Sequence, residues 1–517
     1  MSLLVCCCAS SVLAQSITEA NKVSQSAAAL KGLDSYVHKV MKRWQVPGLA
    51  IAVVKDGKVV LVKGYGVREL GKPGRVDADT LFTIGSNSKQ FTAAALGTLV
   101  STGKLSWDAP VVDYVKNFKL SSPYVTEHIT LRDLLTHRSG YCGTYSVEAM
   151  SDSSDIVERL RYLKPVYGFR THFCYSNLMY KVSARFIPAI TGQSWSRYIK
   201  AHLFEPMDMT RTVSTRVALD ASSNVAEPHA MVYGKVQSIE RTWSRIADFY
   251  APVGFINSSA NDMSHWLLTL LGDGRYQGKS VLKPAVVQAM ETPQMLMASD
   301  SGLGQIMRGT DPYSHFYSYG LGLIVQEYGK HKLVLHGGDV PGMTSAIVMV
   351  PDAKLGIVVL TNQTGDEAPW GVAFHVLQSY TGMPHRDLAR ITHTGELQGE
   401  KQHEAVEAKL TALRKPGTKA PQPLAAYAGL YSDDFDGKLR MSLEKGHLVM
   451  RFANPQYVGD LQYWHDNTFR VTWRNKANDS YLGKAWVTFD VDAFGKPDKL
   501  SFALMPLHYE RVEDKTR

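Results

Sequence analysis

The chain has 517 residues, of which 44% are hydrophobic and 20% charged, and its formal net charge is +9. One hydrophobic core rarely serves a chain of this length, so we expect two domains, one of them large. The positive charge is modest and no long block of Lys or Arg carries it, which argues against a nucleic-acid partner, although a basic surface suits an acidic envelope or a polyanionic wall.

The first segment, Met1–Ala14, has the features of a secretory signal peptide. Its short apolar body ends in Val12-Leu13-Ala14, which fits the small-residue preference of a signal peptidase. This predicts a mature chain from Gln15 and a periplasmic or secreted location. The segment lacks Lys and Arg, and the alternative is a lipoprotein signal at Cys6. No other apolar run is long enough to span a bilayer, so we expect no membrane span.

Removal of the signal peptide leaves Cys142 and Cys174 of the five cysteines. In an oxidising compartment this pair can form a disulfide, and the alternative is two buried free thiols. The sequence leaves both interpretations open.

Two local patterns begin the large domain. Residues Leu33–Trp44 carry their apolar side chains on one stripe, which predicts an amphipathic helix. After Pro47-Gly48, the sequence LAIAVVKDGKVVLVKGYGV predicts two strands joined at Asp56-Gly57, a hairpin turn pair. A helix followed by a hairpin indicates an α/β domain that starts with antiparallel strands.

The stretch Leu81–Val100 joins a β-type run, Leu81–Ile84, to an Ala/Leu-rich helical segment at Gly85. If the helix begins near Ser86, then Ser86 and Lys89 lie on one helix face, with the amine beside the hydroxyl. Free N–H groups at the helix start suit the negative charge that develops during acyl transfer. Ser86 is therefore a candidate nucleophile.

The spacing Ser-x-x-Lys is not specific by itself. It recurs at Ser101/Lys104, Ser280/Lys283 and Ser442/Lys445, where a solvated polar face is the ordinary explanation. Only the first copy precedes a long apolar helical pattern.

Two further stretches carry candidate side chains. The pattern of Ile129–Gly140 predicts a short helix ending in a polar turn, and we interpret His137 there as a hydrogen-bonded structural residue rather than a base. Tyr175-Ser176-Asn177 opens another apolar helical run. Tyr175 and Asn177 can both point into a cleft, one to move protons and one to hold a substrate amide, and the alternative is a packed aromatic beside a helix cap.

The following region predicts strands. Leu271–Ser280 nearly matches a phosphate-binding loop, but its glycine spacing is wrong and we expect a plain turn. Four strands are expected at Tyr319–Val325, Lys332–Leu335, SAIVMV and LGIVVLTN, the last two joined at Pro351-Asp352. His336-Gly337-Gly338 lies at the end of the second strand. Its glycines allow close approach of a substrate to backbone N–H groups that can complete an oxyanion hole.

Beyond Asp387 the composition changes. Glu396–Leu413 is charged and helix-like, and KPGTKAPQP (Lys415–Pro423) is a linker by composition. From Leu424 onward the short β-runs LRMSL, HLVMRF, TFRVTW, AWVTFDV and KLSFALM predict a small antiparallel sheet or barrel. We therefore divide the chain into a signal peptide (1–14), a large domain (15–390), a helix and linker (391–423) and a β domain (424–517).

Three motifs in this order, Ser86-Asn87-Ser88-Lys89, Tyr175-Ser176-Asn177 and His336-Gly337-Gly338, resemble the serine β-lactamase and penicillin-binding-protein superfamily, in particular its class C-like branch of esterases and peptidases. Many members carry Lys-Thr-Gly at the third motif. The phrases LFTIGSNSKQFTA, ITLRDLLTHRSG and HGGDVPGMTS also resemble that branch. The C-terminal segment resembles lipocalin-like barrels attached to some of these hydrolases, including peptidases that act on D-amino-acid peptides.

This resemblance implies an α/β (α+β) fold. The large domain would be a mainly antiparallel sheet flanked by helices, with a helical lobe and the site between them, and the C-terminal domain a small β-barrel. No metal or cofactor is implied.

The resemblance also implies a mechanism. Ser86 attacks an ester or amide carbonyl, Lys89 and Tyr175 share the proton transfers, and water later releases the acyl group. For Lys89 to act as a base near neutrality, its pKa must lie about three units below the free value, equivalent to about 4 kcal/mol. The oxyanion donors would be the N–H groups of Ser86 and Asp339, although Asp339 is less usual there than a small residue.

Substrate contacts would come from Asn177, His336, Gly337 and Gly338. His336 stands where the family often places a lysine that holds a substrate carboxylate. With an ordinary pKa near 6.5 this histidine would be mostly neutral at pH 7.5 and would hold the carboxylate weakly. The alternative is that it only hydrogen-bonds the neighbouring backbone.

The leading hypothesis is an exported serine hydrolase that acts on a peptide or small-molecule substrate, with D-configured or cell-wall-type peptides favoured. One alternative is a class C-like β-lactamase. Another is a penicillin-binding sensor or a ligand carrier without turnover. The substrate and the oligomeric state stay open.

Overall fold

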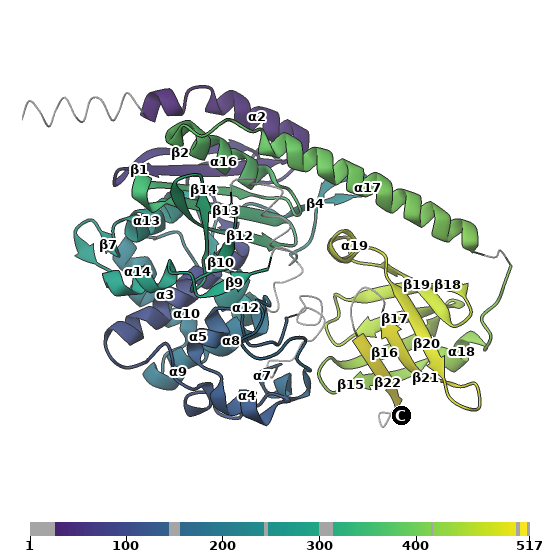
Figure 1. Cartoon of the computed structure of the whole chain (residues 1–517). Helices are drawn as coiled ribbons and strands as arrows, with labels where there is room; N and C mark the ends of the chain where they lie inside the picture. The colour runs from purple at the N-terminus through teal and green to yellow at the C-terminus, as the bar shows by residue number, and fades with distance from the viewer. Residues whose placement is uncertain are drawn as a thin grey trace, which may run out of the picture.

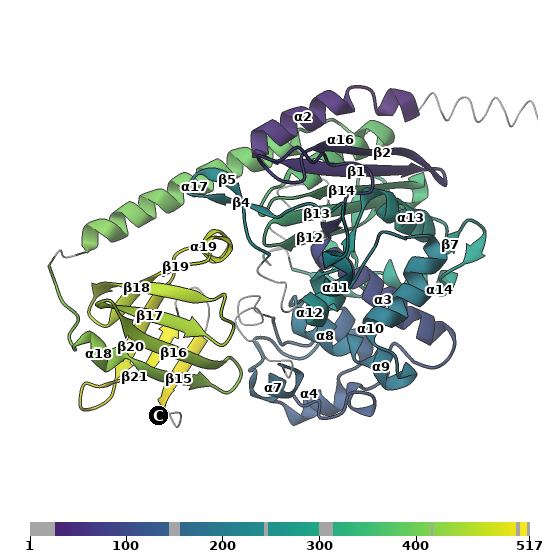
Figure 2. The same ribbon diagram turned by 180° about the vertical axis from the view of Figure 1, so that it is seen from behind.

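The computed structural model describes residues 26–143, 156–241, 247–298, 314–414, 417–502 and 507–513. The proposed signal peptide lies outside the described residues. Figures 1 and 2 show a large α/β body and a separate C-terminal barrel, with one long helix, α17 (Leu388–Leu413), running from the first toward the second.

An eight-stranded sheet is the frame of the large domain. Its order is β2-β1-β14-β13-β12-β11-β10-β9, and every neighbouring pair is antiparallel. The strands are β1 (Gly48–Lys55), β2 (Lys58–Gly66), β9 (Met295–Met297), β10 (Tyr317–Tyr319), β11 (Ile324–Tyr328), β12 (His331–Val340), β13 (Met343–Val350) and β14 (Leu355–Thr361). Because β1 pairs with β14, the N-terminal hairpin completes a sheet whose other six strands come from the second half of the domain.

Helices cover both faces of this sheet, so its central strands are buried throughout. On β1, Ile51 and Val53 pack with α2 (Leu33–Trp44) and α16 (Ala368–Thr381). Ala50 and Ala52 point the other way, toward α3 (Ser88–Ser101) and α13 (Ala260–Leu271). Alternate residues of a strand face opposite sides, which explains why this strand is apolar in nearly every position.

The remaining helices form the helical lobe and its connections. They are α4 (Pro123–His128), α5 (Leu131–Leu135), α7 (Ile156–Arg159), α8 (Asn177–Ala184), α9 (Phe186–Thr191), α10 (Trp195–Ile199), α11 (Arg216–Asp220), α12 (Ala247–Gly254) and α14 (Pro284–Met290). Short 3-10 or π turns are η1 (Gly85–Asn87), η2 (Val111–Asp113), η3 (Leu160–Tyr162), η4 (Lys200–Phe204), η5 (Glu205–Met207) and η7 (Pro351–Ala353). Three two-stranded pairs join β3 (Phe82–Thr83) to β6 (Asn257–Ser258), β4 (His229–Val232) to β5 (Lys235–Ser238), and β7 (Arg275–Tyr276) to β8 (Lys279–Ser280).

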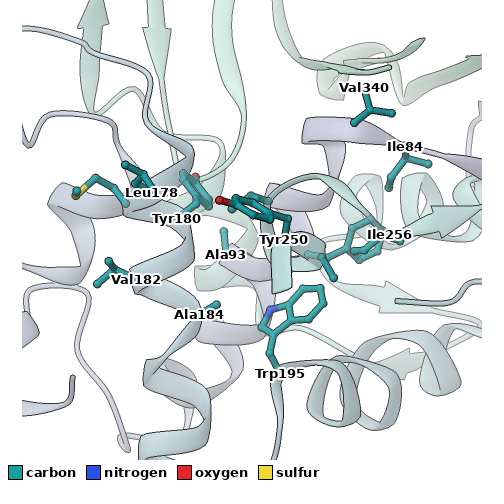
Figure 3. Close-up of a cluster of buried hydrophobic side chains, with 14 of the residues drawn as sticks. Ile84, Ala93, Leu178, Tyr180, Val182, Ala184, Trp195, Tyr250, Ile256 and Val340 are labelled. Carbon is teal, nitrogen blue, oxygen red and sulfur yellow. The ribbon is translucent and has the colours of Figure 1, made fainter. Parts of the chain in front are cut away.

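A hydrophobic core lies where α3, α8 and α12 meet. Figure 3 shows side chains from these elements converging, among them Ala93, Tyr180 and Tyr250, with Ile84 and Val340, the last residue of β12, at the upper right of the view. This core holds the start of α3 against the sheet.

The C-terminal domain is a closed eight-stranded antiparallel barrel. Its elements are α18 (Leu424–Tyr427), β15 (Gly429–Asp433), β16 (Gly437–Glu444), β17 (His447–Phe452), β18 (Val458–His465), β19 (Thr468–Trp473), α19 (Lys476–Leu482), β20 (Trp486–Val491), β21 (Pro497–Phe502) and β22 (Leu507–Val512). Pairing of β15 with β22 closes it. Aromatic side chains such as Tyr431, Phe469 and Tyr509 are buried in this domain, and the rings of Tyr431 and Phe469 both pack against that of Phe489.

The barrel touches the large domain at two described places. Lys476 Nζ donates to Gln237 Oε1 (3.4 Å), and Arg159 Nε donates to the carbonyl of Asp434 (3.4 Å). These contacts join the barrel to the β4–β5 hairpin and to the end of α7.

Several predicted elements are confirmed. Helix α2 spans the predicted Leu33–Trp44, and the first hairpin turns at Asp56 and Gly57, which both have positive φ. Leu271–Ser280 contains the last residue of α13, a turn and the β7–β8 pair. A closed barrel follows the linker, with β15, β18 and β22 in addition to the five predicted runs.

Other boundaries were wrong. The predicted strand Tyr319–Val325 is the end of β10, a turn and the start of β11, because Gly322 adopts φ +79° and reverses the chain. Strand β12 does not end at Leu335 but continues through His336 to Val340, since it pairs with β13 over that whole length. The charged helix begins at Leu388 rather than Glu396.

Among the described residues, no helix is both long and apolar enough to cross a membrane.

Candidate active site

Ser86 lies in η1, a 3-10 turn that leads directly into α3, so the α-helix starts two residues later than the sequence suggested. Gly85 has φ +56°, and a Cβ at this position would lie 2.6 Å from the backbone nitrogen of Asp339. A Cβ at Gly338 would overlap the carbonyl oxygen of Ile84. The backbone of β12 therefore runs against the serine turn, and only glycine fits at both positions. The N–H of Asp339 is thereby brought beside the turn that carries Ser86.

A network of buried polar side chains ties this turn to β13. Asn87 Nδ2 donates to Ser345 Oγ (2.8 Å), and Ser345 Oγ donates to the carbonyl of Ile84 (2.8 Å). Gln90 Nε2 donates to Asn87 Oδ1 (2.7 Å). Sequence reasoning missed these residues, because Asn, Ser and Gln carry no distinctive spacing here and meet only once β13 lies beside η1.

Lys89 is fully buried and reaches back to the serine. Its Nζ donates to Ser86 Oγ (3.0 Å) and to the carbonyl of Val253 (2.8 Å). Val253 belongs to the last turn of α12, whose carbonyls lack helical partners and suit a cation. The aromatic rings of Tyr175 and Tyr180 lie 4.9 and 5.6 Å from the same nitrogen. The sequence indicated the Ser86–Lys89 pair, but a backbone carbonyl from a distant helix has no sequence signature.

Tyr175 lies on the loop before α8, with its ring 4.3 Å from that of His137 and 6.4 Å from that of His336. His137 Nδ1 accepts a hydrogen bond from the N–H of Ser176 (3.0 Å). Burial, together with the charge of Lys89, holds the pKa of His137 well below 6.5, so the ring is neutral. His137 thus supports the tyrosine loop, which agrees with the structural interpretation from the sequence.

Asn177 opens α8 and is buried. Its Oδ1 accepts no hydrogen bond from any described residue. A buried acceptor of this kind can receive an N–H from a substrate.

His336 faces the site with both ring nitrogens engaged. Its Nδ1 lies 2.6 Å from the carbonyl of Gly337, which can only accept, so Nδ1 carries the proton. Nε2 then accepts from the hydroxyl of Tyr319 (2.9 Å). Burial, reinforced by the charge of Lys89, lowers the pKa of His336 to about 3. The assumption of an ordinary pKa near 6.5 was therefore wrong, and the ring offers no positive charge to a substrate carboxylate.

Carboxyl groups lie on the other side of the same strand. Asp339 Oδ2 accepts from Thr344 Oγ1 (3.2 Å) and from the N–H of Gly365 (3.4 Å), and burial raises the pKa of this carboxyl to about 6. Burial and the charge of Asp339 raise the pKa of Glu367 to about 7. Gly337 is packed against Trp370, where a Cβ would lie 2.8 Å from the indole ring.

The other Ser-x-x-Lys copies have ordinary partners. The hydroxyls of Ser101 and Ser280 donate to the carbonyls of Thr98 and Leu282, and that of Ser442 donates to Glu444. Among the described residues, no group of three or more His, Cys, Asp or Glu side chains is arranged to hold a metal ion.

The sequence matches two family models. The model described as Beta-lactamase matches residues 33–380, and a Domain of unknown function (DUF3471) matches residues 413–514. The second carries no functional description, so the likeness of the barrel to lipocalin-like domains stays a prediction.

Curated relatives and solved structures give the same picture. Unguisins hydrolase ungD of Aspergillus violaceofuscus is 28% identical over 449 residues, which cover 82% of this chain and 78% of that protein. Protein flp of Staphylococcus aureus is 26% identical over 347 residues, 65% of this chain and 64% of flp, so the match spans just under two thirds of that relative. The octameric penicillin-binding protein homologue from Pyrococcus abyssi aligns with a TM-score of 0.59 at 23% identity, covering 93% of this chain and 99% of that one.

The first family model covers most of the large domain, including Ser86, Lys89, Tyr175 and His336. With the fold of the penicillin-binding protein homologue and a hydrolase among its relatives, the protein is a serine hydrolase. The chain belongs to the beta-lactamase family.

Proposed function

We propose that the protein is an exported serine hydrolase that cleaves peptide, amide or ester bonds through an acyl-enzyme on Ser86, with D-configured or cell-wall-type peptides favoured. The observation that carries this proposal is the 3.0 Å contact between Lys89 Nζ and Ser86 Oγ in a site where the lysine is fully buried. Export is supported by the signal-like N-terminus and by the disulfide that joins Cys142 to Cys174, since disulfides persist in oxidising compartments.

The geometry supports Lys89 as the base that activates the serine. As an ammonium, its nitrogen donates to Ser86 Oγ and to the Val253 carbonyl. After losing one proton, the amine keeps an N–H on the Val253 carbonyl and turns its lone pair toward Ser86. It then accepts the hydroxyl proton as Oγ bonds to the substrate carbonyl carbon.

The N–H groups of Ser86 and Asp339 stabilise the oxyanion that forms in this step. Tyr175, whose ring lies 4.9 Å from Lys89 Nζ, shares with Lys89 the removal of the hydroxyl proton and passes a proton to the leaving nitrogen or oxygen as the bond to carbon breaks. Water attacks the acyl carbon in the second half of the reaction, and the same groups restore the serine hydroxyl.

The neutral ring of His336 supplies no positive charge of its own to hold a substrate carboxylate. His336 is neutral above about pH 4, given a pKa of about 3, and Asp339 lies on the same strand. We therefore propose that neutral esters and amides are hydrolysed at least as well as β-lactams or peptides with a C-terminal carboxylate. The solved structure of SurE with D-Leu aligns with this chain with a TM-score of 0.53 at 18% identity, and we therefore include D-leucyl amides and esters in the substrate panel.

The test is labelling by a fluorophosphonate, read by intact mass and peptide mapping. We expect a single adduct on Ser86 that Ser86→Ala abolishes together with hydrolysis. Ser101→Ala, Ser280→Ala and Ser442→Ala are matched controls and should label as the wild type does. Label on one of those three serines would contradict the assignment of Ser86.

The same protein incubated with a penicillin separates the alternatives. Rapid acylation followed by rapid release would favour a β-lactamase, and a stable adduct without turnover of any ester or amide would favour a sensor. Ester and amide turnover with slow or absent penicillin acylation is the result that we expect.

A further inference from the structure

The disulfide between Cys142 and Cys174 lies next to the tyrosine of the candidate site. The bond joins residues 32 positions apart in the sequence, with their Cα atoms 5.2 Å apart. Cys174 directly precedes Tyr175 and is buried, whereas Cys142 is partly exposed.

Three hydrogen bonds surround the disulfide and hold the segment 174–176 against the segment 137–143. The N–H of Cys174 donates to the carbonyl of His137 (2.7 Å), and the N–H of Ser176 donates to the Nδ1 of the same histidine (3.0 Å). The N–H of Gly143 donates to the carbonyl of Tyr175 (3.2 Å). The backbone of Tyr175 is therefore fixed on both sides by a segment that the disulfide joins to it.

The orientation of the tyrosine ring depends on the same segment. The ring of Tyr175 lies 4.3 Å from the ring of His137 and 4.9 Å from Lys89 Nζ. Lys89 is fixed independently by the serine turn and by α12. A shift of residues 174–176 thus changes the distance from Tyr175 to Lys89 and Ser86 without moving those two residues relative to each other.

We propose that the Cys142–Cys174 disulfide positions Tyr175 for proton transfer, so that acylation of Ser86 is fast only when the disulfide is intact. This inference rests on the proposed function of Ser86, Lys89 and Tyr175. Reduction requires an external dithiol. Its thiolate attacks one sulfur, the second thiol completes the exchange, and the products are two protein thiols and the oxidised dithiol. The partial exposure of Cys142 gives the attacking thiolate access from that side.

This arrangement makes the enzyme dependent on its compartment. In a reducing cytosol the bond opens and acylation of Ser86 in the precursor is slow. After export the bond forms and holds Tyr175 in position for proton transfer. A general gain in stability from closing a long loop is the competing explanation, and it predicts no special link to Tyr175.

The experiment measures the rate constant for fluorophosphonate labelling of Ser86 in the oxidised full-length chain and after reduction with dithiothreitol. Alkylation and intact mass verify the state of the two thiols. We expect reduction to slow labelling by on the order of tenfold or more, at a temperature where the circular dichroism of both forms is the same, and reoxidation to restore the rate. Cys142→Ser/Cys174→Ser should resemble the reduced wild type and should not respond to the dithiol.

Tyr175→Phe distinguishes positioning from general stability. In that background reduction should change the labelling rate by less than about twofold, and the reduced wild type should share the pH profile of oxidised Tyr175→Phe. Equal labelling of oxidised and reduced wild type would overturn the inference, as would the same loss on reduction with and without the tyrosine hydroxyl. Absence of labelling in the oxidised wild type would instead refute the proposed function.

Discussion

Gly338 offers a direct test of how the candidate oxyanion hole is built, through the substitution Gly338→Ala. The added Cβ would overlap the carbonyl oxygen of Ile84 and lie 2.5 Å from Ser345 Oγ. An ordinary carbon–oxygen contact is about 3.3 Å or longer, so β12 must move away from the serine turn by roughly 1 Å. Because Ile84 is backbone next to the turn and Ser345 is held by two hydrogen bonds, neither partner can yield easily.

The displacement separates the N–H of Asp339 from Ser86. Loss of one oxyanion donor typically lowers the rate by about 100- to 1000-fold, or about 3 to 4 kcal/mol of transition-state stabilisation. Overpacking of this size lowers the stability of the fold by about 1 to 3 kcal/mol, so the variant should still be folded at 25 °C. We therefore expect the fluorophosphonate labelling rate and ester kcat/KM to fall at least 100-fold with a moderate decrease in Tm.

The matched control is Gly395→Ala, on the exposed helix α17, where a Cβ meets nothing within 4 Å. Alanine is a better helix former than glycine, so this variant should keep full activity and a Tm at least equal to that of the wild type. Labelling of Gly338→Ala within about threefold of the wild type, with a normal Tm, would refute the proposed contact between β12 and the serine turn.

Three further predictions follow from the charges of the site. Lys89→Met should lower the labelling rate of Ser86 by about 100- to 10,000-fold with Ser86 still present, whereas Lys104→Met, at the second Ser-x-x-Lys copy, should not change it. Asp339→Asn should remove a pH dependence of stability. Burial raises the pKa of Asp339 to about 6, so the wild type loses stability as pH rises from 4 through 6. Urea unfolding at pH 4 and pH 6 should therefore show a smaller loss of stability in the variant than in the wild type. The value of kcat/KM should be measured for a neutral ester and for its carboxylate-bearing analogue, and the ratio of the first to the second should rise from pH 5.5 to 8.5. The reason is that His336 stays neutral while Asp339 and Glu367 become charged. A falling ratio would contradict this assignment of charges.

Local sequence patterns predicted the elements whose residue pattern depends on a single packing surface or on a single turn. Helix α2 carries its apolar residues on one stripe and was predicted to the residue, and Asp56-Gly57 fixed the first hairpin because few residues tolerate its positive φ. The sequence predicted too short a strand here, Lys332–Leu335, because His336-Gly337-Gly338 has low strand propensity. Only pairing with Ala346 and Ser345 on β13 makes these positions extended, and that pairing is not visible in the local sequence.

In the candidate site, too, the sequence indicates some groups, whereas others are visible only in the folded structure. The side chains of Ser86, Lys89 and Tyr175 could be selected from the sequence, and the structure brings them together. The Val253 carbonyl could not be identified from the sequence, because every residue has a carbonyl. Only the fold shows that this one lies at the end of a helix beside Lys89. The sequence does not decide whether Cys142 and Cys174 form a disulfide for a related reason, since two cysteines in a chain show their separation in sequence but not in space.

The charges along β12 also bear on which substrates the site can select. A lysine in the third motif would provide a cation above the strand, and a substrate carboxylate would then be attracted at any physiological pH. Here the ring of His336 is neutral, and both of its nitrogens are occupied by Tyr319 and by the neighbouring backbone. The charge that acts on His336 itself is that of Lys89. On the other side of the strand, burial raises the pKa values of Asp339 and Glu367 to about 6 and 7, so that side changes from nearly neutral to negative across the physiological range. Under the proposed function, these carboxyl groups would disfavour a substrate carboxylate beside β12, and among the described residues the buried Asn177 Oδ1 and the β12 backbone could hydrogen-bond a neutral substrate.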